Sequence, residues 1–226
     1  YEMLQNVSSF KPLSDDVAFE TVVIGGGFVG TAAARRLAEN MPDKQFLLVD
    51  ALKIGQGASG RNSGFVIDQP HKRDLELGDN ELKRKIIRLN GVAIDYLEQQ
   101  INTFGINCQW SSAGKYQAAV GPRGEKFLNH YETLLRSSGE SFERLNKEQM
   151  RETFGTNYYS AAIYTPGGKL IQPAALMRGL ADNMPTNTRV VENTPVLEIT
   201  RVQGGFRLKT LNSEIHCRSL ILATNV

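Results

Sequence analysis

The sequence predicts an α/β fold built around a parallel sheet, with a small antiparallel meander near the C-terminus. Over residues 19–50, an apolar run that ends in glycines, a helical pattern and a second apolar run follow one another. This is the order of a strand–helix–strand unit. Residues 189–226 instead form short alternating runs separated by turn residues, which is typical of antiparallel strands.

The strand–helix–strand unit is defined by three successive segments. Residues 19–27, FETVVIGGG, combine β-branched residues with a glycine ending and predict a buried strand. Residues 27–39 predict a helix that Asn40 and Pro42 end, and residues 45–50, QFLLVD, predict the second strand. The unit has the length of about 30 residues that a right-handed crossover between parallel strands needs.

The middle of the chain predicts a loop followed by mixed helices and strands. Residues 53–71 are glycine-rich and mostly aperiodic, which indicates a backbone that approaches something closely. We expect Asp79 to cap a long amphipathic helix that Gly105 ends, with apolar residues at Leu82, Ile86, Leu89, Ala93, Leu97, Ile101 and Phe104. Further along, we expect a strand over 114–120, a helix over 122–137, a strand and a Pro-Gly-Gly turn within 160–173, and a helix over 174–184.

The chain ends in SLILATNV, residues 219–226, a continuous apolar run typical of a buried parallel strand. Such a strand needs cover on both faces, so we expect the chain to be truncated after residue 226. The alternative interpretation is a strand at the edge of a sheet that simply ends there.

The composition favours an ordinary globular domain, with 41% apolar residues, 22% charged residues and a net charge of +2. We expect no nucleic-acid partner, because no strongly basic face is implied. Cys108 and Cys217 form no C-x-x-C motif, so we expect no metal site or local thiol pair, and a distant disulfide stays an alternative. We expect a cytoplasmic protein without a signal peptide, and without a membrane span, since no apolar window reaches about 18 residues.

Gly25, Gly27 and Gly30 follow the first predicted strand in the spacing G-x-G-x-x-G. In a Rossmann-type unit these glycines allow a tight turn, a close approach to a pyrophosphate and close helix packing, and the helix N-terminus attracts the phosphates. Asp50 lies 20 residues after Gly30, where a carboxylate accepts hydrogen bonds from a ribose hydroxyl and disfavours a 2′-phosphate. The motif predicts a site for NAD or FAD, between which it does not decide.

The segment GASGRNSG, residues 57–64, resembles the glycine-rich loop of the FAD-dependent amino-acid oxidoreductases. This family includes D-amino-acid oxidases and dehydrogenases, sarcosine and glycine oxidases and γ-glutamylputrescine oxidase, and the Gly-Arg-Asn form looks most like the last branch. The stretches 106–120, 170–181, 192–199 and 220–226 agree with the family in order and spacing. The resemblance covers the chain from residue 19 onward and implies FAD rather than NAD.

The resemblance also implies which residues hold the cofactor. The ADP half of FAD would be bound by Gly25, Gly27, Phe28, Val29, Gly30, Asp50 and Ala51. The pyrophosphate, ribityl chain and flavin ring would be lined by Ser59, Arg61, Asn62, Ser63 and Gly64. Val196 would offer its backbone to adenine, and Ala223 and Thr224 would approach the pyrophosphate or the ribityl chain. The alternatives are a surface arginine at Arg61, ordinary turn chemistry at Asn62 and Ser63, and a core valine at Val196.

The activity that the resemblance implies is oxidation of the C–N bond of a small-molecule amine or amino acid. Hydride passes from the α-carbon to flavin N5, the imine is hydrolysed, and oxygen or another acceptor reoxidises the flavin. No catalytic residue is assigned, and His71 is expected to be a loop histidine. An NAD-dependent dehydrogenase and a non-catalytic nucleotide-binding module are the alternatives.

The resemblance divides the chain into an N-terminal arm over 1–17, an FAD-binding domain in two parts over 18–75 and 166–226, and part of an interleaved α+β substrate domain over 76–165. The family's later chain supplies most of the substrate-facing sheet. We therefore expect this chain to be an FAD-binding N-terminal fragment that is inactive by itself.

Overall fold

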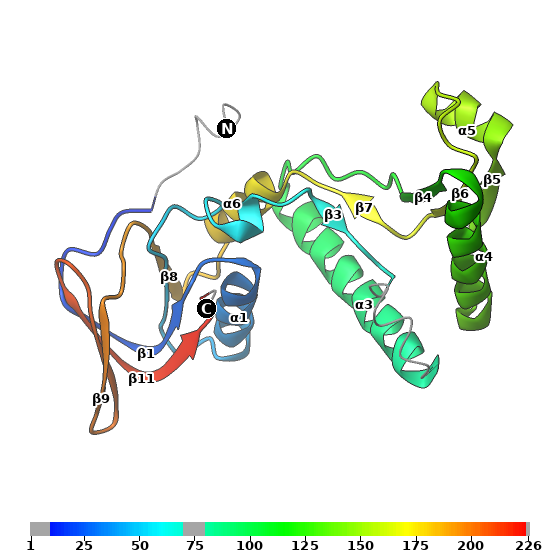
Figure 1. Cartoon of the computed structure of the whole chain (residues 1–226). Coiled ribbons are helices and arrows are strands. Elements are labelled where there is room, and N and C mark those ends of the chain that lie inside the picture. Colours follow the sequence, from blue (N-terminus) through cyan, green and yellow to red (C-terminus); the bar gives the residue numbers. More distant parts are fainter. Residues whose placement is uncertain (1–9, 70–79, 225–226) are drawn as a thin grey trace. The chain divides into compact units, whose positions relative to one another are not determined.

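The computed structural model describes residues 10–69 and 80–224 (Figure 1). The chain divides into two compact units. The first unit comprises Tyr1–Ser63, Gln100–Cys108 and Gln172–Val226, and the second comprises Gly64–Gln99 and Gln109–Ile171. Each unit is described by itself below.

The first unit is built on a six-stranded sheet with the strand order β8-β2-β1-β11-β10-β9. β8, β2, β1 and β11 pair in parallel, and β10 and β9 continue from β11 in antiparallel pairs. The strands are β1 (Val17–Ile24), β2 (Phe46–Val49), β8 (Thr188–Val191), β9 (Glu198–Val202), β10 (Gly205–Lys209) and β11 (Glu214–Leu222). The predicted α/β class with a parallel sheet and a small meander is confirmed.

The prediction that the meander begins at residue 189 is wrong for its first strand. β8 pairs with β2 in parallel, from Phe46 opposite Thr188 to Val49 opposite Val191. The physical reason lies in burial: Val190 and Val191 point to opposite faces of the sheet and are both buried, as in a strand covered on two sides. The meander proper consists of β9, β10 and β11.

Helices cover one face of this sheet. α1 (Phe28–Asn40) and α6 (Pro173–Asp182) bring Ala34 and Met177 onto Val23, Leu48 and Val190. The small residues of α1 allow the close packing that a crossover helix needs. Figure 1 shows α1 beside β1 and β11.

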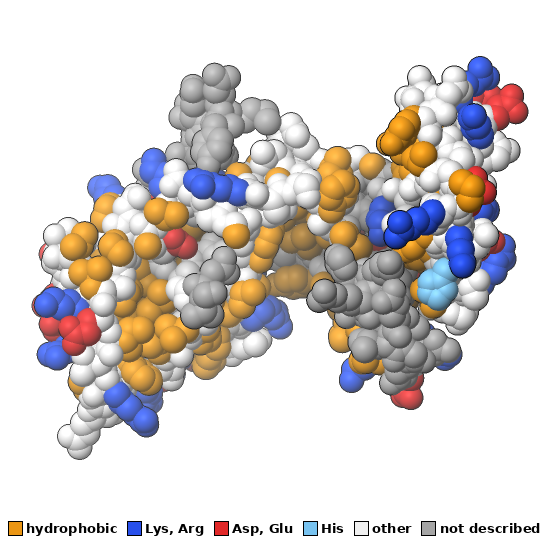
Figure 2. All heavy atoms as spheres, in the orientation of Figure 1, with side chains coloured by type: hydrophobic (Ala, Val, Ile, Leu, Met, Phe, Trp, Pro, Cys, Tyr) orange, Lys and Arg blue, Asp and Glu red, His pale blue; other side chains and the backbone are white. Residues whose placement is uncertain are grey.

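The opposite face of the sheet carries a second apolar cluster that includes Val22, Leu47 and Val191. Leu13 packs into this cluster with 2% of its surface exposed. The described part of the expected N-terminal arm is therefore anchored in the core. In the view of Figure 2, hydrophobic side chains also gather where Figure 1 draws β1 and β11.

The second unit contains a three-stranded antiparallel sheet in the order β4-β6-β5 and a two-stranded sheet of β3 and β7. Its strands are β3 (Phe65–Val66), β4 (Lys115–Ala119), β5 (Glu143–Asn146), β6 (Ala161–Thr165) and β7 (Lys169–Leu170), and its helices include α4 (Gly121–Ser138) and α5 (Lys147–Phe154). Leu128, Tyr131 and Leu135 of α4 pack on Ile163 of β6. The sequence prediction missed β5 and α5, although Asn146 and Gln149 form a capping box with the spacing that marks a helix start.

The long helix α3 (Asn80–Phe104) is present as predicted. Its expected cap, Asp79, and the loop histidine, His71, lie outside the described residues. Ile94 and Ile101 are buried, whereas Leu82 and Leu89 of the predicted apolar stripe are exposed. Over the ranges that the structure describes, every helix is too short or too polar to cross a lipid bilayer.

Candidate dinucleotide-binding site

Three loops of the first unit leave the same edge of the parallel sheet. β1 ends at Ile24 and leads through glycines into α1, β2 ends at Val49 and is followed by Asp50, and β11 ends at Leu222. Because β1 lies between β2 and β11, the three loops meet at the carboxyl ends of adjacent parallel strands. Open α/β sheets bind their ligands at this edge.

The first glycine loop has no room for side chains. Gly25 has φ +105°, and a Cβ atom there would lie 2.6 Å from the carbonyl oxygen of Ala223. A Cβ atom at Gly30 would lie 1.8 Å from the carbonyl oxygen of Gly25. The two positions therefore require glycine, and they bring Ala223 and the first loop into contact, as the resemblance implies.

The N-terminus of α1 is suited to an anion. Gly27, its N-cap, has no side chain, and the first turn holds no acidic residue, so this turn adds no negative charge at the positive end of the helix dipole. Phe28 and Val29 of this turn are 40% and 71% exposed. This donor set and the crowded glycines fit a diphosphate with a flat apolar group beside it.

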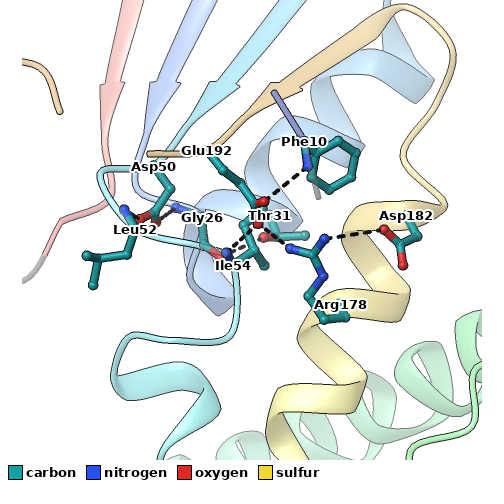
Figure 3. A network of polar contacts seen from close by, with 9 residues as sticks. All are labelled: Phe10, Gly26, Thr31, Asp50, Leu52, Ile54, Arg178, Asp182 and Glu192. Carbon is teal, nitrogen blue, oxygen red and sulfur yellow. Dashed lines mark hydrogen bonds and ion pairs between the residues drawn. The ribbon is translucent and has the colours of Figure 1, made fainter. Parts of the chain in front are cut away.

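Asp50 ties the first glycine loop to the loop after β2 (Figure 3). Its Oδ2 accepts the Gly26 N–H at 2.6 Å and its Oδ1 accepts the Leu52 N–H at 2.7 Å. A carboxylate has about four lone-pair positions, so it can still accept hydrogen bonds from ribose hydroxyls. Ala51, which follows it, is exposed.

The second glycine-rich loop is joined to the first through Ser59. This residue lies in a short 3₁₀ helix, η2 (Ala58–Gly60), and its Oγ accepts the Phe28 N–H at 3.0 Å. Asn62 donates to the carbonyl oxygens of Ala58 and Ser59. These bonds fit the alternative role of Asn62, in which its side chain stabilises a turn. Arg61 and Ser63 are exposed. Gly64 belongs to the second unit, and its role toward a cofactor stays a prediction.

The loop after β8 lies against the loop after β2. The Thr194 N–H donates to the Asp50 carbonyl oxygen at 2.9 Å, and the Asn193 N–H donates to the Leu52 carbonyl oxygen at 3.4 Å. Val196, two residues further on, is half-buried and packs on the sheet. Ala223 donates its N–H to the Ile24 carbonyl oxygen at 2.8 Å, and Thr224 is exposed beside it. These positions surround the glycine loop, and their contacts with a cofactor stay predictions.

Sequence reasoning missed a buried acid and base beside these loops. Glu192, directly after β8, is 0% exposed and pairs with Arg178 of α6, which is 5% exposed. Arg178 stands inside the otherwise apolar run ALMRGLA, and Glu192 directly follows two valines in RVVENTP. A charge at a core position is the signal that could have found them, because such residues are buried only when paired.

Shifted pKa values occur in both units. In the first unit, burial raises the pKa of the Cys217 thiol on β11. In the second unit, burial raises the pKa of Tyr131 and lowers the pKa of Lys115. The nearby carboxylate of Asp68 adds to the rise in the pKa of Tyr131 and opposes the fall in the pKa of Lys115. These groups lie on β11, α4 and β4, not in the loops at the sheet's carboxyl edge.

The fold and the loops together define a dinucleotide-binding α/β protein. The sequence profile of the family "FAD dependent oxidoreductase", DAO, matches residues 20–226, and the chain belongs to this family. The resemblance stated from residues 57–64 is therefore confirmed, and FAD is the cofactor of the family.

Individual relatives agree with the family assignment. The chain is 25% identical over 221 residues to the gamma-glutamylputrescine oxidoreductase of Escherichia coli and 24% identical over 221 residues to the probable oxidoreductase OrdL of Haemophilus influenzae. Each match covers 96% of this chain and 51% of the relative. The chain thus spans about half the length of these curated relatives.

Solved structures share the fold. Glycine oxidase from Geobacillus kaustophilus superposes with a TM-score of 0.78 at 20% identity, over 92% of this chain and 55% of that one. L-amino acid deaminase from Proteus myxofaciens superposes with a TM-score of 0.75 at 15% identity, over 97% and 48% of the two chains. At these identities the likeness concerns the fold.

Proposed function

We propose that this chain forms the FAD-binding part of an enzyme that oxidises the C–N bond of an amine or amino acid to an imine. The observation that carries the proposal is the meeting of the α1 N-terminus, Asp50 and Ser59 at one edge of the sheet. The family supports FAD as the dinucleotide, and relatives named for γ-glutamylputrescine and glycine support the substrate class.

In this proposal each loop has its own part of the cofactor. The amide groups from Gly27 to Gly30 bind the pyrophosphate, and Asp50 orients the ribose of the adenosine half. The backbone at Val196 contacts adenine, and Ala223 and Thr224 flank the pyrophosphate. The loop with Ser59, Arg61, Asn62, Ser63 and Gly64 lies along the ribityl chain and the flavin. When bound, FAD supplies the acceptor for the hydride that leaves the substrate carbon.

The chain's own contribution is binding and orientation. The close-packed glycines place backbone donors against the pyrophosphate, and fixed donors need no rearrangement when the ligand binds. Because the chain spans about half of its curated relatives, the proposal places the substrate-facing groups in sequence that these relatives have beyond the matched region. The chain alone is then expected to bind FAD without turning over substrate.

The test is an anaerobic titration of the protein in its full length, loaded with FAD, with a panel of primary amines, secondary amines and amino acids. We expect at least one member of the panel to bleach the flavin absorbance, because reduction removes the visible bands. A panel that leaves the spectrum unchanged, while dithionite still bleaches it, would contradict the proposed substrate class.

A further inference from the structure

The carboxylate of Glu192 is fully buried and accepts hydrogen bonds from two segments of main chain. Its Oε1 accepts the Ile54 N–H at 2.6 Å, and its Oε2 accepts the Phe10 N–H at 3.1 Å. Ile54 belongs to the loop after β2, and Phe10 lies at the beginning of the described N-terminal segment. Figure 3 shows both donors pointing at the carboxylate, with the guanidinium of Arg178 beside the Ile54 N–H.

Arg178 offsets the cost of burying the Glu192 carboxylate, because it supplies the opposite charge. Its Nη1 donates to Glu192 Oε1, its Nη2 lies 3.8 Å from Asp182, and its guanidinium lies 5.2 Å from the centre of the Phe10 ring. A buried carboxylate without a cation and hydrogen-bond donors is strongly unfavourable. With the cation and two amide donors, the carboxylate becomes a fixed anchor point.

The anchored loop is the one that carries Asp50. Ile54 is the fourth residue after Asp50. The Ile54 side chain packs under the first glycine loop: a Cβ atom at Gly26 would lie 2.9 Å from its Cγ1. Asp50 in turn accepts the Gly26 N–H. The position of Ile54 therefore sets both the carboxylate and the glycine loop that the proposed ADP site uses.

We propose that Glu192 is a positioning residue for the dinucleotide, which anchors residues 50–54 so that Asp50 and the first glycine loop are in place before the ligand binds. This inference rests on the proposed function. It goes beyond that function because Glu192 and Arg178 are buried and are not among the residues proposed to contact the cofactor. Their effect on affinity is carried through the Ile54 N–H.

A role confined to fold stability predicts a different outcome, and a pair of variants separates the two. Glu192→Gln keeps the size of the side chain, but an NH₂ group replaces one of the two acceptor oxygens, so only one of the two N–H groups keeps its acceptor. In the double variant Glu192→Met with Arg178→Met, no buried charge is left unpaired. Replacement of a buried ion pair by apolar residues is often neutral or stabilising, but methionine accepts neither N–H.

The first measurement is deuterium exchange of the chain, followed by mass spectrometry. In the double variant, which offers neither N–H an acceptor, we expect faster exchange in peptides that cover residues 10–13 and 51–56, with β1 and β2 peptides unchanged. Unchanged exchange at 51–56 overturns the proposal. This measurement needs no cofactor, so it decides the positioning role even if the wild-type chain proves not to bind FAD, which would count against the proposed function alone.

The second measurement is the affinity for FAD and for ADP, by fluorescence titration and by competition. Both affinities should fall by about tenfold in Glu192→Gln, the effect of one charge-assisted hydrogen bond. Both should stay low in the double variant even where its melting temperature returns to that of the wild type. Recovery of affinity together with the melting temperature would show a purely structural role and overturn the proposal.

The matched control is Glu132→Gln. Glu132 also pairs with arginines, Arg136 and Arg144, but on the surface of α4 in the second unit. This variant makes the same chemical change without touching residues 50–54. It should leave loop exchange and both affinities unchanged, and a loss equal to that of Glu192→Gln would mean that the effect is not specific to the anchor.

Discussion

The two units use the same residue types under different constraints. In the first unit, Gly25 faces main chain from another loop, where an added Cβ would meet the Ala223 carbonyl oxygen at 2.6 Å. In the second unit, Gly91 lies within α3, and an added Cβ would meet nothing within 4 Å. A glycine therefore indicates a functional loop where a second segment of main chain approaches it. The spacing of glycines between a strand and a helix can reveal such a position in the sequence.

Buried polar groups differ in a similar way. In the first unit, the carboxylates of Glu192 and Asp50 accept main-chain N–H groups from loops at the candidate site. In the second unit, the buried hydroxyls of Tyr131 and Thr165 lie near each other, yet neither has hydrogen-bond geometry with a partner. Carboxylates thus hold loops at the candidate site through main-chain hydrogen bonds, whereas these two hydroxyls of the second unit do not.

Core truncations should separate the units most strongly. Leu48→Ala in the first unit and Leu128→Ala in the second each remove a side chain that is 0% exposed and should each cost about 2–5 kcal/mol. Only the first should abolish FAD binding. Trp110, the single tryptophan, lies in the second unit, so its fluorescence in denaturant reports that unit. Equal loss of FAD affinity in both variants would break the distinction.

A glycine pair tests the backbone constraint at a smaller scale. Gly30→Ala forces the Gly25 carbonyl to move and should cost about 1–3 kcal/mol and eliminate measurable FAD binding. Gly91→Ala should raise the free energy of unfolding by about 0.5–1 kcal/mol, because alanine favours the helix. Denaturant unfolding measures the stability of both variants, and flavin titration measures their affinity for FAD. A Gly30→Ala protein that binds FAD normally would contradict the requirement for glycine at this position.

A capping variant should act in the second unit alone. Asn146 accepts the Gln149 N–H at 3.0 Å, and its own N–H donates to the Gln149 side chain at 2.9 Å. Asn146→Ala should cost about 1 kcal/mol by Trp110 fluorescence, with FAD affinity unchanged. A matched change outside the box, Asn129→Ala on the exposed face of α4, should cost much less.

The smallest expected effect is a loss of stability at alkaline pH, which should begin in the first unit and reach the second at higher pH. The pKa of Cys217 is raised from its ordinary value of 9.0 and that of Tyr131 from 10.0. The unfolded chain then loses each proton first, so stability is full below these values and falls as pH rises through them. Cys217→Ala should remove the fall that begins near 9, and Tyr131→Phe the fall that begins near 10. Unchanged pH profiles of the unfolding midpoint would contradict both.

How far the sequence predicted this molecule depends on the range of each interaction. The glycine loop, Asp50 and the loop with Ser59 were predictable because local motifs carry them. The parallel pairing of β8 was not predictable, because a run of four residues does not reveal which strand will pair with it. The role of Glu192 was missed because the N–H groups that it accepts lie far away in sequence, at Phe10 and Ile54.

The central claim is that the loops at the carboxyl edge of the parallel sheet bind FAD. It is tested most directly by titrating the purified chain with FAD and with NADH, while the flavin absorbance and fluorescence of the bound fraction are recorded. We predict saturable binding of FAD that ADP competes away and NADH does not. Binding of NADH in place of FAD, or a folded chain that takes up neither, would contradict it.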